Sequence, residues 1–414
     1  MNNKYDINII YLSTSCSLNK FRYIQKMGVN KDVPQAQKYH RLLIEGLAEN
    51  TRSMVNAISL IPTNRKWSNK LFFPAEYEDV GNVKYYYVPF INYPILKHVA
   101  LYCYLYFKLS NIIKNNRDTV IICDIWNQIL SSVARKIGKN NNIPVIGIVT
   151  DVPGYRSDAY KKNNNFIKQK LVNLVENIAR ENSVKYDGYL LLTKKMNYVV
   201  NPFNKPSLVM EGHADVGMRN RRKNCRNKKP YIAVYAGTIH KEYAIPELVQ
   251  AFYDGEYNDW ELHIFGDGNF AKELQLKCEF MKNIIFHGLV PNEDVIDFQL
   301  RANLIINPRP TTGDYVQYSF PSKTLEAMVS GTPLLTTKLP GIPDEYFEYI
   351  YVMEDGYDGI CNGLKRVLDL PLDDLEEKGA SARKFVIGNK TNVMQGKKFT
   401  EFIVKLNNEK KYNE

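Results

Sequence analysis

Short apolar runs of strand length alternate with segments of helical periodicity through the first half of the chain. After the first run, Tyr39, Leu42 and Leu47 recur at a spacing that places them on one helix face. The preceding Asp32-Val33-Pro34 favours a helix start, because proline fits the first helical position. The alternation predicts a doubly wound α/β domain. The predicted strands cover residues 7–13, 53–60, 83–89, 120–124, 145–149 and 189–192.

The same alternation starts afresh in the second half. Gly237, Gly266 and Gly288 follow or end three successive apolar runs, and glycine lets the backbone approach a ligand closely. A helical segment with Leu248 and Phe252 on one face separates the first two runs. The second half therefore also reads as a parallel α/β sheet. Its predicted strands cover residues 231–236, 261–265, 284–288, 304–307 and 334–337.

Length and pattern together indicate two domains. A chain of 414 residues is long for one domain and sufficient for two. The last segment has Phe399, Phe402, Ile403 and Leu406 on one helical face. The predicted organisation is an N-terminal domain at 1–215, a basic linker at 216–229, a C-terminal domain at 230–390 and a C-terminal helix at 391–414.

Residues 307–346 carry the most informative pattern. A strand ends near Asn307, a loop follows, and a helix is predicted from Lys323 with Ser322 as its N-cap. Gly331 closes that helix before the next strand. A helix N-terminus with a hydroxyl and a first-turn lysine favours anions such as a diphosphate. Glu326, one turn on, is placed to accept hydrogen bonds from vicinal hydroxyls; the alternative is an ordinary capped helix with solvated Lys323 and Glu326.

This stretch resembles the donor-site signature of retaining glycosyltransferases of family 4. Glu326-Ala327-Met328 and Gly331-Thr332-Pro333 match its second half, and Tyr318 stands where many members have a first glutamate. The run Ser319-Phe320-Pro321-Ser322-Lys323 resembles a polysaccharide-assembly subgroup, as do 307–309 and 341–346. The resemblance implies the GT-B fold: two Rossmann-like doubly wound domains facing a cleft, with the last helix crossing back to the first domain.

The resemblance also implies donor-binding residues. The family usually has an arginine and a lysine after the first glycine, and these bind the diphosphate. Here Thr238 takes the arginine place and Tyr243 falls near the lysine place, so Lys241, Lys323 and Arg309 are expected to compensate. The expected donor-binding set is Gly237, Thr238, Lys241, Gly266, Arg309, Ser319, Phe320, Pro321, Ser322, Lys323 and Glu326.

A candidate on the first domain is Asp151, which follows the apolar run 145–149. Open α/β sheets place ligands at the carboxyl ends of their strands. The sequence Thr150-Asp151-Val152-Pro153 resembles the subgroup's version of an acceptor-facing strand end, which places Asp151 with Lys323 and Glu326 among the expected catalytic residues. The alternative role for Asp151 is a turn or cap before proline.

The resemblance implies a retaining hexosyltransferase that moves a sugar from a nucleotide-diphosphate sugar to a saccharide acceptor. That acceptor is expected to be lipid-linked, in surface or capsular polysaccharide biosynthesis. No Asp-Xaa-Asp occurs at a plausible strand end, so neither a metal nor another cofactor is expected. Two alternatives are a nucleotide-sugar epimerase on the same fold and a non-catalytic protein that binds anionic surfaces.

Charge and apolar content suggest a membrane surface as a partner. The net charge is +11, and seven of the eleven residues at 219–229 are basic, which indicates an exposed linker or a contact with anionic lipid. A nucleic-acid partner is not expected, because no binding motif or nearby stacking aromatic accompanies the basic run. The apolar stretch 95–113 has only nine uncharged residues between His98 and Lys108, against the ~20 that span a bilayer. It is read as a buried helix, or alternatively as an aromatic-rich face on a membrane.

Cysteine usage and the N-terminus bear on location. The six cysteines show no close pairs and no metal-ligand spacing, which favours reduced thiols in the cytosol. The first residues lack the apolar run of a signal peptide. The expected location is cytoplasmic and peripheral on the inner face of the cell membrane.

Overall fold

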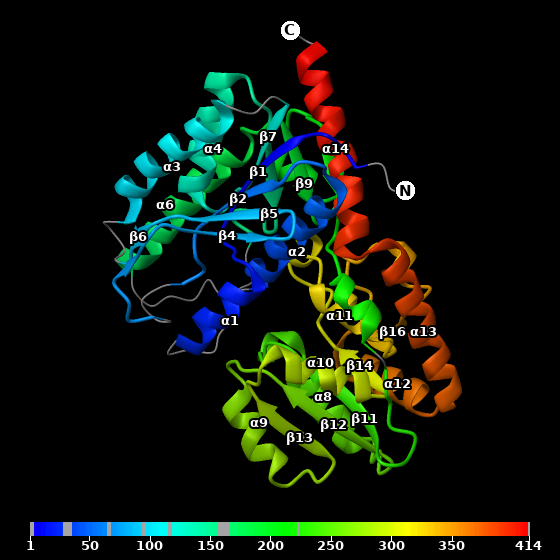
Figure 1. Cartoon of the computed structure of the whole chain (residues 1–414). Coiled ribbons are helices and arrows are strands. Elements are labelled where there is room, and N and C mark those ends of the chain that lie inside the picture. The colour runs from blue at the N-terminus through cyan, green and yellow to red at the C-terminus, as the bar shows by residue number, and fades with distance from the viewer. Residues whose placement is uncertain are drawn as a thin grey trace. The chain divides into compact units, whose positions relative to one another are not determined.

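A computed structural model describes residues 4–27, 35–63, 68–92, 97–114, 118–155, 166–221 and 223–412. The chain divides into two compact units (Figure 1): Met1–His213 with Asn392–Glu414 is unit 1, and Ala214–Thr391 is unit 2. The expected helix start at 32–34, the basic Arg222 and the first two residues of the apolar 95–113 stretch lie outside the described residues.

The sheet of unit 1 is parallel except at one edge. Its strands are β1 Asn8–Ser13, β2 Val55–Ser59, β4 Glu76–Val80, β5 Val83–Tyr87, β7 Thr119–Asp124, β8 Val145–Val149, β9 Gly188–Leu191 and β10 Ser207–Val209; β3 Phe72–Phe73 and β6 Phe90–Ile91 form a separate pair. Within the described residues the strand order is β10-β9-β8-β7-β1-β2-β5-β4. β1 is buried along its whole length, with Ile10 opposite Asn56 and Ile121 on its two neighbours. The edge strands β4 and β10 were not predicted, because both are short and largely exposed.

Helices cover the unit 1 sheet, and the last helix of the chain belongs to this unit. They are α1 Leu18–Met27, α2 Gln35–Asn50, α3 Lys97–Lys114, α4 Gln128–Asn141, α6 Phe166–Ser183, α7 Met196–Val200 and α14 Asn392–Tyr412. α14 runs alongside α2 (Figure 1), and the two approach backbone to backbone. A Cβ added at Gly46 would lie 2.0 Å from the carbonyl oxygen of Asn392, and one at Gly396 would lie 2.4 Å from the Gly46 carbonyl. Glycine is therefore required at both positions.

Unit 2 contains a fully parallel sheet. Its strands are β11 Tyr231–Ala236, β12 Trp260–Phe265, β13 Ile284–Gly288, β14 Leu304–Asn307, β15 Leu334–Thr337 and β16 Tyr351–Met353, and its helices are α8 Ile245–Asp254, α9 Ala271–Cys278, α10 Asn292–Arg301, α11 Ser322–Ser330, α12 Gly356–Leu368 and α13 Leu372–Asn389. Short 3-10 turns lie at Val216–Asn220, Lys241–Tyr243, Val316–Tyr318 and Asp344–Tyr346. The strand order β13-β12-β11-β14-β15-β16 reverses direction between β11 and β14. Ligands of open α/β sheets bind at the carboxyl ends of the strands at such a switch point.

These two sheets confirm the predicted α/β class with two doubly wound, Rossmann-like domains. The core of unit 2 includes the helix face predicted from periodicity, with Leu248 and Phe252 fully buried against the sheet. In α3, Leu101, Leu105 and Leu109 are buried while Phe107 is exposed, so this helix packs one face inward and presents the other to solvent. None of the described helices is long and apolar enough to span a bilayer.

In the described part of the basic segment 219–229, four basic side chains form ion pairs or hydrogen bonds with unit 2, while Arg219 and Lys228 are exposed. Lys223 is the clearest case: its ammonium donates to Thr332 Oγ1 at 2.7 Å, and burial lowers its pKa to about 8. The contacts are Arg221 with Glu293 and Asp297, Lys223 with Ala302 and Thr332, Arg226 with Glu261, and Lys229 with Asp259. Much of the charge that suggested a lipid contact is therefore used within unit 2.

Candidate functional site

The turn after β11 sits at the switch point of unit 2, where Lys323 and Tyr235 occupy the space that a side chain at Gly237 would need. A Cβ at Gly237 would lie 2.3 Å from Lys323 Nζ and 2.5 Å from the Tyr235 hydroxyl. Gly266, at the end of β12, has φ +135, and a Cβ there would lie 1.7 Å from the Gly237 carbonyl oxygen. The Gly237 amide donates to the Phe265 carbonyl at 2.9 Å. The two strand ends are thus packed backbone to backbone beside a lysine.

That lysine comes from α11, whose first residue is Ser322. Ser322 was expected as the N-cap, but Pro321 holds that place in extended conformation and no side chain caps the helix. The exposed Ser322 hydroxyl is therefore not used as a helix cap. Gly331 ends the helix in the left-handed conformation, as expected. The positive end of the helix dipole lies at Ser322 and Lys323.

Lys323 joins the helix start to the end of β11. Its Nζ donates to the Ala236 carbonyl and lies 5.7 Å from the centre of the Tyr235 ring. Burial lowers the pKa of Lys323 to about 8; the charge of Glu326 acts to raise it, and that of Arg309 acts to lower it further. A strongly perturbed lysine at a strand-end turn is a functional-site candidate on physical grounds.

Arg309 lies on the loop that leaves β14. Its guanidinium carbon is 5.3 Å from the centre of the Tyr243 ring and 5.2 Å from that of Tyr315, and the Thr337 hydroxyl donates to its carbonyl oxygen. Its Nε is buried and has no hydrogen-bond partner among the described residues. The site thus brings Gly237, Gly266, Arg309, Lys323 and Glu326 into one neighbourhood.

Three of the other expected donor residues, Ser319, Phe320 and Pro321, lie on the loop before α11 and pack within unit 2. Phe320 is buried and packs 5.8 Å, centre to centre, from the Tyr346 ring. The Ser319 carbonyl oxygen would lie 2.0 Å from a Cβ at Gly341, so the 341–346 motif packs against this loop. Pro321 is also buried. This part of the signature shapes the loop before α11.

The residues after Gly237 do not form a second cationic cluster. Thr238 is exposed, and its carbonyl accepts a hydrogen bond from the Tyr235 hydroxyl at 2.9 Å. Lys241 forms a 2.7 Å ion pair with Glu273, so its charge has a partner on α9. The charge of Lys241 is therefore balanced by a carboxylate, whereas Lys323 is a buried lysine with a lowered pKa.

In unit 1, Asp151 lies exposed just after β8. Its carbonyl oxygen accepts a hydrogen bond from the Trp126 indole at 3.0 Å, and the Trp126 amide donates to Asp124 Oδ1 at 2.9 Å. Behind them His40 Nε2 is 3.6 Å from Asp124 Oδ2, and His40 Nδ1 is 2.7 Å from the Tyr11 hydroxyl. These buried polar groups support the strand ends that carry Asp151.

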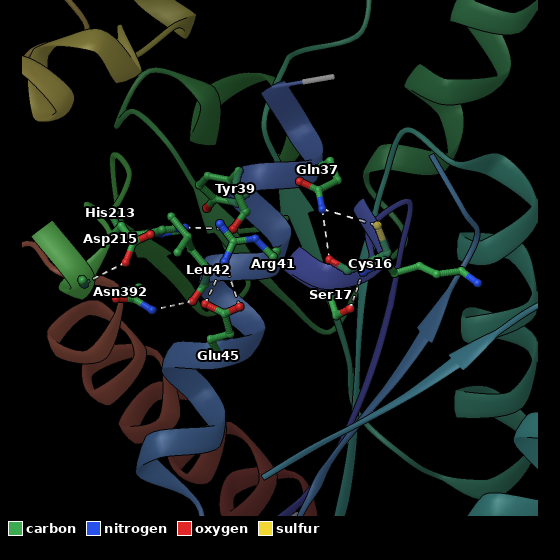
Figure 2. Close-up of polar contacts among 12 residues, drawn as sticks. Cys16, Ser17, Gln37, Tyr39, Arg41, Leu42, Glu45, His213, Asp215 and Asn392 are labelled. Carbon is green, nitrogen blue, oxygen red and sulfur yellow. Dashed lines mark hydrogen bonds and ion pairs between the residues drawn. The ribbon is translucent and has the colours of Figure 1, made fainter. Parts of the chain in front are cut away.

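Helix α2 connects this edge to two distant parts of unit 1 (Figure 2). The Gln37 amide donates to the Cys16 carbonyl at 3.0 Å, and the Asn392 amide donates to the Leu42 carbonyl at 3.2 Å. His213 Nε2 donates to the Tyr39 carbonyl at 2.8 Å. Burial lowers the pKa of His213 to about 4, the hydrogen bond to Tyr39 acts against that shift, and the charge of His40 adds to it. The imidazole is therefore neutral at pH 7.

Several groups were not found from the sequence. Tyr315 has no motif around it, and nothing in the sequence places Tyr11, His40 and Asp124 together, since they come from three separate elements. All six cysteines are free, in agreement with their spacing. Among the described residues no group of three or more His, Cys, Asp or Glu side chains is arranged to hold a metal ion.

Comparisons with solved structures identify the fold. A sucrose-phosphate synthase from Thermosynechococcus elongatus superposes with TM-score 0.63 at 13% identity, covering 95% of this chain and 98% of its own. A trehalose 6-phosphate synthase from Burkholderia multivorans superposes with TM-score 0.62 at 10% identity, covering 99% of this chain and 98% of its own. Anabaena HepE in complex with UDP and glucose superposes with TM-score 0.58 at 11% identity, covering 95% of this chain and 98% of its own. At such identities the likeness shows the fold alone, which is GT-B.

The sequence comparisons are more restricted. None of the curated proteins compared with this chain matches it. Residues 218–385 match the family model described as Glycosyl transferases group 1, which covers most of unit 2 and includes Gly237, Arg309 and Lys323. Unit 2 thus matches the glycosyltransferase group 1 model, and this match together with the GT-B fold supports a glycosyltransferase.

Proposed function

We propose that this enzyme transfers a hexose from a nucleotide-diphosphate sugar to a saccharide acceptor, with retention at the anomeric carbon. The observation that carries the proposal is the position of Lys323, whose ammonium lies against the Gly237 turn at the start of α11. A cation, a helix N-terminus and a tight glycine turn are the elements that bind a diphosphate.

The proposed reaction is the one that the family resemblance implies, and this charge distribution suits its anionic leaving group. The acceptor hydroxyl oxygen forms a bond to the anomeric carbon on the face from which the diphosphate leaves. The bond between that carbon and the phosphate oxygen breaks, and the departing phosphate oxygen takes the acceptor proton. Lys323, Arg309 and the start of α11 stabilise the charge on the nucleoside diphosphate. Glu326 accepts hydrogen bonds from the ribose hydroxyls, and the proposed course uses no metal or other cofactor.

Unit 1 is proposed to bind the acceptor. Asp151 is exposed at a carboxyl strand end and its backbone is fixed by the Trp126 indole, which suits a group that orients the acceptor by receiving a hydrogen bond from one of its other hydroxyls. The residue stands on unit 1, whereas the donor residues stand on unit 2. Donor affinity and acceptor use are therefore expected to respond to different substitutions.

The acceptor is proposed to be a lipid-linked saccharide of surface or capsular polysaccharide assembly, with the enzyme attached peripherally to the inner face of the cell membrane. Support comes from α6, where Leu174, Val175 and Ile178 are 56%, 53% and 41% exposed. Their spacing puts them on one side of the helix, which suits an interface with acyl chains. The protein should sediment with anionic vesicles at low salt; no retention on such vesicles would refute the attachment.

Product analysis tests the reaction. The enzyme is incubated with UDP-, GDP-, ADP- and CMP-sugars, with and without saccharide acceptors, and the products are separated. Release of the free nucleoside diphosphate together with a lengthened saccharide of retained configuration is expected. An isomerised donor would identify an epimerase instead, and binding without turnover would favour a non-catalytic protein. A nucleotide at about 100 times its dissociation constant should stabilise the fold by roughly 2.7 kcal/mol in a thermal-shift screen.

A further inference from the structure

The surroundings of Arg309 differ from those of the basic residues of unit 2 that form ion pairs. Arg221 lies 2.5 Å from Glu293, and Lys241 lies 2.7 Å from Glu273, so each of these charges is neutralised by a carboxylate. Arg309 instead lies between the rings of two tyrosines, and within the described part of the chain no carboxylate is within ion-pair distance of it. Aromatic faces hold a guanidinium through cation–π attraction while its N–H donors stay available.

Arg309 also has a hydrogen-bond donor that no described residue uses. Its Nε is buried and makes no hydrogen bond to any described residue. A buried N–H without a partner is costly unless a ligand or ordered water completes it. Lys323 lies close enough for the charge of Arg309 to depress its pKa. The repulsion between these two neighbouring cations is relieved when an anion binds to both of them.

We propose that Arg309 is the principal diphosphate-binding arginine of this enzyme and that Tyr243 and Tyr315 are positioning residues that hold its guanidinium toward the ligand. The inference rests on the proposed donor function and deepens it. Thr238 and Tyr243 stand at or near the places where related enzymes carry the basic pair after the first glycine. In this chain the positive charge comes from Arg309 on the loop after β14, and the Tyr243 ring contacts its guanidinium.

Calorimetric titration with UDP and with inorganic pyrophosphate tests this assignment, because pyrophosphate carries no base or sugar. Arg309→Gln should weaken both ligands by about 10–100-fold. Tyr243→Leu and Tyr315→Leu should each weaken them by about tenfold, whereas Tyr243→Phe and Tyr315→Phe should bind as the wild type does, since the ring face is retained. Arg301→Gln is the matched control: Arg301 also lies over an aromatic ring, 4.6 Å from the centre of Phe298, and its removal should leave affinity unchanged.

A double-mutant cycle separates positioning from a general structural effect. In an Arg309→Gln background the tyrosine-to-leucine changes should lose their effect on pyrophosphate affinity, and thermal midpoints should stay close to those of the single arginine variant. Additive losses would overturn the positioning assignment, as would Tyr243→Leu and Tyr315→Leu variants that bind like the wild type. If the wild type binds pyrophosphate in this pattern but transfers no sugar, the proposed function fails and the anion site stands. If the wild type binds neither ligand, both are overturned.

Discussion

The switch points of the two sheets share a topology and differ in chemistry. Between β11 and β14 of unit 2, the strands end in glycine turns and two basic side chains, Lys323 and Arg309, lie near them. Between β1 and β7 of unit 1, the strand ends carry small hydroxyl groups and the buried Asp124 beside His40. The first arrangement suits an anionic leaving group, and the second suits neutral hydroxyls. In the proposed function, the two units therefore divide donor and acceptor chemistry between them.

A substitution where the strand ends of unit 2 pack backbone to backbone should cause the largest loss of stability. Gly266→Ala places a Cβ 1.7 Å from the Gly237 carbonyl oxygen at φ +135, so the free energy of unfolding should fall by about 3–4 kcal/mol. Gly288→Ala is the control, because Gly288 has φ +67 but open space around it; a loss of about 1–2 kcal/mol is expected. Equal losses in denaturant titrations of the two variants would show that contact between the strand ends is unimportant.

The buried His213 should make the stability of unit 1 sensitive to acid. The folded-state pKa of His213 is lowered to about 4, mainly by burial, so below its ordinary value near 6.5 the unfolded state takes up a proton that the folded state does not. The free energy of unfolding should fall as the pH drops from about 6.5 to about 4, by roughly 2–3 kcal/mol from this group.

His213→Gln retains a donor for the Tyr39 carbonyl and has no titrating ring. Its free energy of unfolding should lose that part of the acid dependence. Chemical denaturation at several pH values measures the difference, and identical pH profiles for the two proteins would contradict the assignment.

Removing the lysine of unit 2 should affect donor binding directly. Lys323→Ala loses one charge-assisted contact to the diphosphate, which should cost about 1.5–3 kcal/mol of binding free energy and slow transfer. Calorimetry with UDP gives the affinity, and Lys241→Ala is the comparison, because its ammonium is already paired with Glu273. Unchanged affinity and kinetics in a folded Lys323→Ala protein would remove the anion site from α11.

A substitution on the other unit should leave donor affinity alone. Asp151→Asn removes the charge of an exposed carboxylate at the end of β8 while keeping its size. Transfer to the acceptor should fall several-fold or more, by analogy with the loss of one hydrogen bond to a charged group. The dissociation constant of the nucleoside diphosphate should stay the same. A selective loss of donor affinity would mean that Asp151 serves the donor instead.

The apolar runs and glycine turns predicted the sheets of both units, because buried parallel strands are continuous apolar segments. The helix that carries Lys323 was also predicted from the sequence, because the residues that start and end a helix are close to each other along the chain. The tyrosines around Arg309 and the Tyr11–His40–Asp124 contacts were not, since they join separate elements and depend on tertiary packing. The Ser322 cap was misplaced by one residue, because Pro321 meets the conformational demand of the cap without a side-chain hydrogen bond.

The central claim is that an anionic diphosphate binds against Lys323. This lysine has a pKa of about 8, so near pH 8 about half of the molecules carry an uncharged amine. A bound anion raises that pKa, whereas the phosphates of UDP are already ionised, since their second pKa is about 6. Binding should therefore take up about half a proton per site at pH 8 and less at pH 6.5.

Calorimetric titration of UDP in buffers of different ionisation enthalpy measures this uptake directly, with GDP and ADP tested in parallel. The wild type should take up protons at pH 8 when the nucleotide binds. Lys323→Met should bind more weakly and take up none. Binding by the wild type without proton uptake, or equal uptake by the Lys323→Met variant, would contradict the placement of the diphosphate at the start of α11.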